Sequence, residues 1–187
     1  MLVQELKEMG IADARVDEKC YVYASIPATE GYENVPAIGL IAHMDTAPDF
    51  CGENVKPQII PEYDGNDIQL TGSGEFIKVS EFPSLENLKG HRLITTDGTT
   101  LLGADDKAGI AEIMTAVAEI IEENIPHGDI WVCFTPDEEV GMGPNSFDFD
   151  HFKAAYAYTV DGSYEADIAY ENFNAASALF HVKGVSV

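Results

Sequence analysis

The stretch AIGLIAHMD, residues 37–45, decides the fold, because an apolar strand runs directly into His43 and Asp45. A short apolar run bounded by turn residues is typical of a buried strand. Side chains along a strand repeat every second position, so Asp45 faces the same side as His43. It can therefore hold the second ring nitrogen of a metal-binding His43. Taken alone, such a pair is more often an ordinary hydrogen bond at the surface.

Two later strands also end in acidic residues. Residues 130–135 (IWVCFT) lead to Glu138 and Glu139, and residues 155–160 (AYAYTV) lead to Asp161. Ligands of open α/β sheets bind beyond the carboxyl ends of the strands. We therefore expect these carboxylates to lie near the end of the first strand.

The clearest helix covers residues 106–123, whose apolar positions follow a period of about 3.6 residues. Asp105 and Asp106 stand at its start, where the helix dipole favours negative charge. Strands and helices that alternate in this way predict an α/β fold, a mixed sheet flanked by helices.

The remaining elements are expected on weaker patterns. They are a helix over 2–9, strands over 14–16 and 21–26, a short helix near 147–152, and strands over 168–170 and 175–182. Residues 46–92 are rich in Gly, Pro, Asn and Asp. We expect them to form a long excursion of loops and hairpins, with short β segments near 68–70 and 76–79, and not a separate domain.

Composition narrows the class of protein. The chain has 187 residues, 45% of them hydrophobic, which is enough for a sizeable core. It has no apolar run long enough to span a membrane. Its formal net charge of −23 argues against nucleic acid or an anionic membrane as a partner, and favours cations. Three cysteines without C-x-x-C spacing favour a reducing cytoplasm.

The carboxylates at the strand ends predict a metal site. Like charges repel in a partly desolvated site, and a divalent cation relieves that repulsion. A mixed imidazole and carboxylate set suits zinc, with manganese or cobalt as alternatives. The adjacent Glu138 and Glu139 cannot point the same way, so one can bind metal while the other acts as a general base. The simpler interpretation of this pair is a solvent-exposed acidic turn.

Together these motifs resemble the dizinc exopeptidase family, which includes tripeptide aminopeptidases, carboxypeptidase G and succinyl-diaminopimelate desuccinylase. The motifs are residues 43–46 (HMDT), 102–109 (LGADDKAG), 134–141 (FTPDEEVG) and 158–162 (YTVDG). Residues 171–177 (ENFNAAS) are similar to the tripeptide aminopeptidases in particular. The resemblance covers nearly the whole chain and keeps the order of the motifs.

The resemblance implies a site for two zinc ions. Asp105 would bind both ions. His43 and Asp161 would complete the ligands of one ion, and Glu139 would bind the other. A cis peptide bond between Asp105 and Asp106 is also implied.

The resemblance also implies two residues that serve the reaction but are not metal ligands. Glu138 would be the general base acting on the attacking water. Asp45 would be the clamp that orients His43.

The family's catalytic domain resumes after an inserted lid domain, and its last zinc-binding histidine lies in that second part. This chain ends at Val187. We therefore expect a fragment, with residues 1–171 as a partial catalytic domain and residues 172–187 as the first strand of the lid. Such a fragment should bind one zinc ion tightly at most and turn over substrate poorly or not at all. Sheet edges left without partners favour self-association.

The function expected of the complete parent is metal-dependent removal of the N-terminal residue from short peptides. The first alternative is a related dizinc amidohydrolase, either a carboxypeptidase or a deacylase, because the specificity residues lie mostly in the lid. The second alternative is a non-catalytic acidic metal-binding module.

Overall fold

The computed structural model describes residues 1–162, 167–171 and 174–185, and its centre is a five-stranded mixed sheet of order β1-β2-β8-β3-β9. β3, β8 and β9 are parallel, while β2 is antiparallel to both β1 and β8. The strands are β1 (Arg15–Val16), β2 (Val22–Ile26), β3 (Ile38–His43), β8 (Ile130–Thr135) and β9 (Tyr156–Thr159). The predicted α/β fold with a mixed sheet is confirmed.

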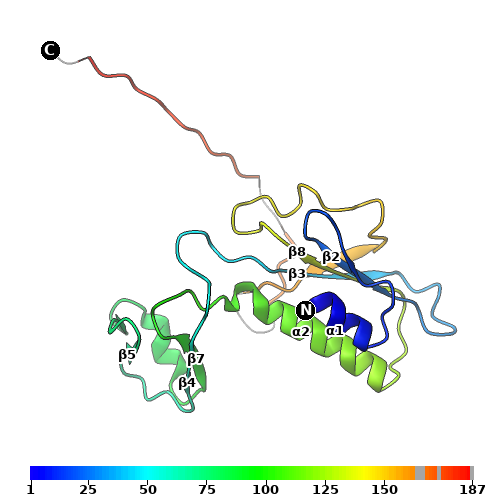
Figure 1. The fold of residues 1–187 in the computed structure, drawn as a ribbon, viewed down its shortest axis with the longest axis horizontal. Helices are drawn as coiled ribbons and strands as arrows, with labels where there is room; N and C mark the ends of the chain where they lie inside the picture. Colours follow the sequence, from blue (N-terminus) through cyan, green and yellow to red (C-terminus); the bar gives the residue numbers. More distant parts are fainter. Residues whose placement is uncertain (163–166, 172–173, 186–187) are drawn as a thin grey trace.

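The helices α1 (Leu2–Glu8) and α2 (Ala104–Glu122) pack on one face of this sheet (Figure 1). Apolar positions of α2 that recur at helical spacing, such as Ile113 and Val117, are buried against the strands. Leu6 of α1 is fully buried in the same cluster. This layer holds the start of α2 at the carboxyl end of β3.

The opposite face of the sheet is covered by the loop between β8 and β9. Phe147 and Phe152 of this loop pack against Tyr21, Tyr23 and Cys133. Gly39 of β3 makes room for this contact, because a Cβ atom there would overlap the Phe152 ring. The loop therefore serves as the second layer of the domain.

The short helix expected near residues 147–152 is wrong. The chain forms successive turns there, and the side chain of Asp148 accepts a hydrogen bond from the backbone N–H of His151 at 3.0 Å. Phe147 and Phe152 point into the aromatic cluster, whereas Phe149 is exposed.

The parallel register brings three strand ends to one edge of the sheet. His43 is paired with Thr135 at the end of β8, and Ile41 is paired with Thr159 at the end of β9. The loop after β8 and the segment after β9 therefore leave the sheet beside His43. This is the edge at which the sequence predicts the site.

The excursion after β3 folds into a small lobe beside the main sheet (Figure 1). Its elements are β4 (Pro57–Ile60), β5 (Ile68–Gln69), β6 (Phe76–Ile77), the 3-10 helix η1 (Pro83–Leu88) and β7 (Leu93–Thr96). The predicted β segments near 68 and 76 are confirmed as the hairpin of β5 and β6. The pairing of β4 with β7 was not predicted, because the two strands are separated by the rest of the lobe.

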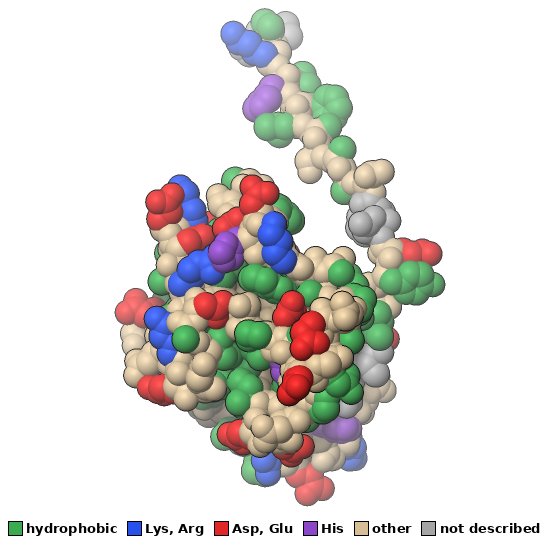
Figure 2. Space-filling model, turned by 90° about the vertical axis from the view of Figure 1, so that its right-hand side faces the viewer, with side chains coloured by type: hydrophobic (Ala, Val, Ile, Leu, Met, Phe, Trp, Pro, Cys, Tyr) green, Lys and Arg blue, Asp and Glu red, His purple; other side chains and the backbone are tan. Residues whose placement is uncertain are grey.

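Residues 167–171 and 174–185 carry no helix or strand, so the strands expected over 168–170 and 175–182 are not formed there. The last of these segments extends away from the rest of the molecule with its apolar side chains exposed (Figure 2). A strand requires a neighbour for its backbone groups, and among the described residues no strand is paired with these segments. The expected domain boundary falls at 171–172, partly outside the described residues, and stays a prediction.

Among the described residues, every helix is too short or too polar to cross a bilayer.

Candidate metal centre

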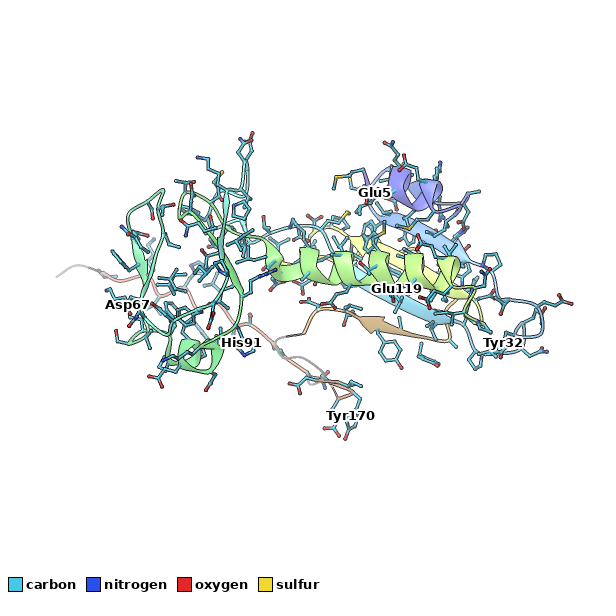
Figure 3. The ribbon with its side chains drawn as sticks, turned by 90° about the horizontal axis from the view of Figure 1, so that it is seen from below. Glu5, Tyr32, Asp67, His91, Glu119 and Tyr170 are labelled. Atoms are coloured by element: carbon cyan, nitrogen blue, oxygen red, sulfur yellow. The ribbon has the colours of Figure 1, made fainter. Side chains whose placement is uncertain are left out.

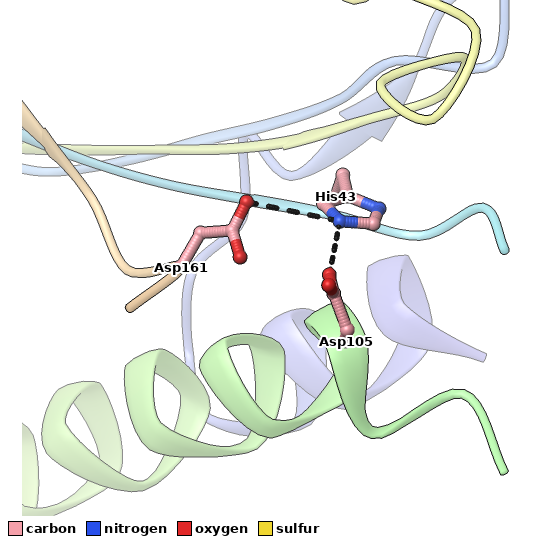
Figure 4. Close-up of side chains that lie close together, drawn as sticks. All are labelled: His43, Asp105 and Asp161. Carbon is pink, nitrogen blue, oxygen red and sulfur yellow. Dashed lines mark hydrogen bonds and ion pairs between the residues drawn. The ribbon is translucent and has the colours of Figure 1, made fainter. Parts of the chain in front are cut away.

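His43, Asp105 and Asp161 converge at the carboxyl edge of the sheet (Figure 4). The His43 Nε2 atom lies 2.8 Å from Asp105 Oδ1 and 3.8 Å from Asp161 Oδ2. One ligand atom from each of the three residues lies within 4.8 Å of the others. Such a cluster of one imidazole and two carboxylates can hold a divalent cation.

Each of these residues is delivered by a different element. His43 is the last residue of β3 and is 2% exposed. Asp105 stands in the first turn of α2, just after Gly103, whose φ of 75° is a left-handed conformation that glycine adopts without strain. Asp161 follows β9, which is held to β3 by the hydrogen bond from Val160 N to the backbone oxygen of Ile41. The cis peptide bond between Asp105 and Asp106, implied by the resemblance, is present.

Asp45 lies on the other side of the imidazole. Its Oδ1 atom is 3.3 Å from His43 Nδ1, a nitrogen that is buried and lacks a hydrogen-bond partner among the described residues. The Asp45 carboxylate also accepts hydrogen bonds from the backbone N–H groups of Glu138 and Glu139, at 3.1 and 3.0 Å. Asp45 therefore connects the segment after β3 to the loop after β8.

The two adjacent glutamates are placed differently. Glu138 Oε2 lies 4.0 Å from His43 Nε2, and its side chain is about half exposed. Glu139 reaches the site through its backbone N–H on Asp45. Within the described part of the chain, the Glu139 carboxylate is not a member of the metal-binding group, so its role as a ligand stays a prediction.

Two buried tyrosines position the loop that carries these glutamates. The Tyr21 hydroxyl donates to the backbone oxygen of Gly143 at 2.7 Å. The Tyr23 hydroxyl accepts from the backbone N–H of Asp148 at 2.8 Å, and burial raises the pKa of Tyr23 to about 12. This support was not predicted from the sequence. Tyr21 and Tyr23, two positions apart, could have indicated one packed face at the start of β2, but not the loop that covers it.

Asp106 is a second buried residue that the sequence analysis did not assign to the site. It is 3% exposed, and its carboxylate accepts hydrogen bonds from the backbone N–H groups of His43 and Gly109. Burial is the main cause that raises the pKa of Asp106, and the nearby charge of Asp161 adds to it. Its sequence signal was only the adjacency of two aspartates, which does not indicate which one turns inward.

The charges around His43 perturb its titration. Burial lowers the pKa of His43, but the hydrogen bond to Asp105 and the charges of Asp45 and Asp161 outweigh it, and the pKa is raised above 6.5. Burial also acts on Asp45, where it raises the pKa. Hydrogen bonds from the backbone N–H groups of Glu139 and Glu138 lower the pKa of Asp45 by more than burial raises it, so it falls below 3.8.

The donor set fits a divalent metal ion. One buried ring nitrogen and carboxylate oxygens from two separate segments face a common point, and the ring nitrogen on the far side lies against Asp45. Carboxylates that meet in a partly buried site repel one another, and a cation at their centre would offset that repulsion. Nitrogen and oxygen ligands of this kind are typical of zinc, manganese and cobalt sites.

The known proteins that this chain resembles are peptidases. Residues 89–172 match the model of peptidase family M20/M25/M40. Over its whole length the chain is 59% identical to a Peptidase T of Aliivibrio salmonicida. The chain is therefore similar to the peptidases of family M20/M25/M40. Peptidases of this family are metal-dependent, in agreement with the cluster around His43.

Solved structures of the family share this fold. The chain superposes on the aminopeptidase PepT from Bacillus cereus with a TM-score of 0.62 and 29% identity, covering 86% of this chain and 36% of that one. It superposes on a tripeptidase from Staphylococcus aureus with a TM-score of 0.63 and 30% identity, covering 87% of this chain and 37% of that one. The chain spans 46% of the length of the Aliivibrio relative.

Proposed function

We propose that the complete protein is a zinc-dependent aminopeptidase that removes the N-terminal residue from short peptides, and that this chain carries a large part of its catalytic site. The observation that carries the proposal is the convergence of His43, Asp105 and Asp161 at one point. The names of relatives and structural neighbours, Peptidase T, aminopeptidase and tripeptidase, support the reaction class.

In this proposal, His43, Asp105 and Asp161 would hold one zinc ion, and Asp105 and Glu139 would hold a second. When bound, zinc would supply Lewis acidity toward water and toward the peptide carbonyl. Asp105 is suited to bridging because it stands at the start of α2, facing His43 while most of its side chain remains accessible.

Glu138 is the proposed general base. Its carboxylate lies at the edge of the cluster and is accessible to solvent. A carboxylate held there can take a proton from the attacking water and pass it to the leaving amine. Asp45 fixes its backbone through the hydrogen bond to Glu138 N. The base therefore stands on a segment tied to the same strand end as His43.

The charge of the chain supports a peptide substrate with a free N-terminus. The net charge is −23, and the site itself is lined by carboxylates. The free ammonium group of a peptide is attracted to such a site, whereas a carboxylate of the substrate is repelled. Blocked peptides are therefore expected to be poorer substrates, which separates an aminopeptidase from a related deacylase.

The general-base role is tested in the complete protein by Glu138→Gln, with hydrolysis of a tripeptide and zinc content as the two measurements. We expect turnover to fall about 100- to 10,000-fold with zinc retained. Glu119→Gln, on the outer side of α2 (Figure 3), is the matched control and should keep wild-type turnover. Full activity of Glu138→Gln would remove Glu138 as the base.

We further propose that this chain alone binds one zinc ion tightly, because His43, Asp105 and Asp161 already face one another. Isothermal titration with zinc should give one tight site per chain. Two equal and tight sites would contradict this.

A reducing cytoplasm is the proposed setting. Cys20, Cys51 and Cys133 are free thiols. Disulfides are rare in reducing compartments, which fits this pattern.

Self-association through β9 is proposed as well. β9 is the last strand in the sheet order, and its Tyr156 and Tyr158 are about half exposed. Edge strands of this kind pair readily with other chains. Light scattering of this chain over a range of concentrations tests it, and a strictly monomeric chain would contradict it.

A further inference from the structure

Asp106 is a buried carboxylate that holds two segments together beside the metal centre. Its Oδ2 atom accepts a hydrogen bond from the backbone N–H of His43 at 3.1 Å, which joins the end of β3 to the start of α2. Its Oδ1 atom accepts one from the backbone N–H of Gly109, also at 3.1 Å. A carboxylate as buried as this one is costly unless its oxygens are hydrogen-bonded. The two backbone donors therefore give Asp106 one fixed position.

Gly109 brings the same turn of α2 against the end of β9. A Cβ atom at this position would overlap the carbonyl oxygen of Val160 and also crowd the Asp106 carboxylate. Glycine is needed where two backbones approach this closely. Val160 directly precedes Asp161, so the contact sets the place from which Asp161 reaches the site.

We propose that Asp106 and Gly109 form a joint that fixes the relative positions of His43, Asp105 and Asp161, and that Asp106 is a positioning residue of the metal centre. The inference rests on the proposed function, because it requires those three residues to be metal ligands. His43 ends β3, Asp105 begins α2, and Asp161 follows β9. The joint lies where these three elements meet.

Two variants act on the joint in different ways. Asp106→Asn keeps the shape of the side chain, but its NH₂ group cannot accept a hydrogen bond from a backbone N–H, and a negative charge is lost. Gly109→Ala keeps every charge and pushes α2 away from Val160. The control is Asp97→Asn in the lobe, because Asp97 is also buried and accepts a backbone hydrogen bond, from Thr99 at 2.9 Å.

The experiment measures zinc affinity by isothermal titration and the visible absorption spectrum of bound Co²⁺, for the wild-type chain and the three variants. We expect Asp106→Asn and Gly109→Ala each to weaken zinc binding about 10- to 100-fold, the range found when groups supporting metal ligands are removed. Both should also change the Co²⁺ spectrum, because the ligand geometry is altered. Asp97→Asn should keep the wild-type affinity and spectrum.

Two results would overturn the joint. One is weaker binding by Asp106→Asn with an unchanged Co²⁺ spectrum, since that indicates only a lost charge. The other is that Gly109→Ala keeps the wild-type zinc affinity and Co²⁺ spectrum. If circular dichroism shows that Asp106→Asn is unfolded, the result for Gly109→Ala alone decides whether the proposed joint exists. A wild-type chain that binds neither zinc nor Co²⁺ would overturn the proposed function too, so the two failures are distinguishable.

Discussion

Asp45 Oδ2 accepts a hydrogen bond from the backbone N–H of Glu139 at 3.0 Å, although the two residues lie in segments far apart in the sequence. Asp45 Oδ1 accepts from Glu138 in the same way and also faces the buried Nδ1 of His43. One carboxylate therefore connects the imidazole to the loop that carries the proposed base. The loop after β8 and the end of β3 are expected to respond together when Asp45 is changed.

Asp45→Asn tests this connection. The amide keeps one acceptor oxygen for two backbone donors, and it removes the negative charge beside His43. We expect zinc affinity to fall about 10- to 100-fold, because His43 and the Glu138 loop lose their shared support. Isothermal titration gives the affinity, and Asp49→Asn in the exposed loop that follows is the control. Equal zinc affinities for the two variants would count against a supporting role for Asp45.

His43 is expected to be the least replaceable ligand. It is the only described member of the metal-binding group that is buried, and Asp105 and Asp161 both face its Nε2 atom. His43→Gln should abolish tight zinc binding by this chain. His91→Gln is the control, because His91 lies in the lobe (Figure 3) and should leave zinc affinity unchanged. Tight binding by His43→Gln would place the metal site elsewhere.

The raised pKa of His43 predicts how the metal-free chain responds to pH. A folded pKa above the unfolded value of 6.5 means that the folded state binds the proton more tightly. The stabilisation is therefore complete below 6.5 and is lost as the pH rises through the folded pKa. Asp45 does not contribute to this change, because its lowered pKa makes its stabilisation complete above 3.8 and lost only as the pH falls through its folded value.

Urea unfolding with a chelator present measures this effect. The difference in unfolding free energy between the wild-type chain and His43→Gln should be larger at about pH 6 than at about pH 8.5. Zinc affinity should change in the opposite direction and rise with pH, because protons compete for the imidazole. A free-energy difference that grows with pH would show that burial dominates the titration of His43.

Sequence patterns predicted the part of the fold that positions the site. The apolar runs before His43, Glu138 and Asp161 became the parallel strands β3, β8 and β9, and their ends meet because parallel strands share one carboxyl edge. The periodic apolar positions of α2 likewise predicted its buried face. These signals are strong because they depend on local spacing alone.

Sequence patterns failed where distant segments decide the structure. The partner of β4 (Pro57–Ile60) is β7 (Leu93–Thr96), and no local pattern indicates that pairing. The helix expected near residues 147–152 is replaced by a loop, in which Phe147 packs against Tyr21 and Tyr23. Such outcomes depend on tertiary contacts, which override local propensity.

Tyr21→Phe tests how far the β8–β9 loop depends on its tyrosine support. The variant removes the hydroxyl that donates to Gly143 O and leaves that oxygen without its partner. We expect a loss of about 1–3 kcal/mol in unfolding free energy. Hydrogen exchange should quicken in residues 138–148 and remain unchanged in α2. Tyr156→Phe on the exposed edge of β9 is the control, and equal protection of the loop in both variants would contradict the support.

The packing of α2 on β3 predicts a larger loss of stability, because this interface determines where Asp105 stands relative to His43. Ile113 is 2% exposed within the cluster of α2 and sheet side chains. Ile113→Ala should lower the unfolding free energy by about 2–5 kcal/mol, since it removes buried methyl groups and leaves a cavity. Ile125→Ala just beyond the helix is the control, because Ile125 is 40% exposed and should cost far less. Urea unfolding of the two variants measures the difference. Equal losses would mean that the α2 face contributes no more stability than the surface does.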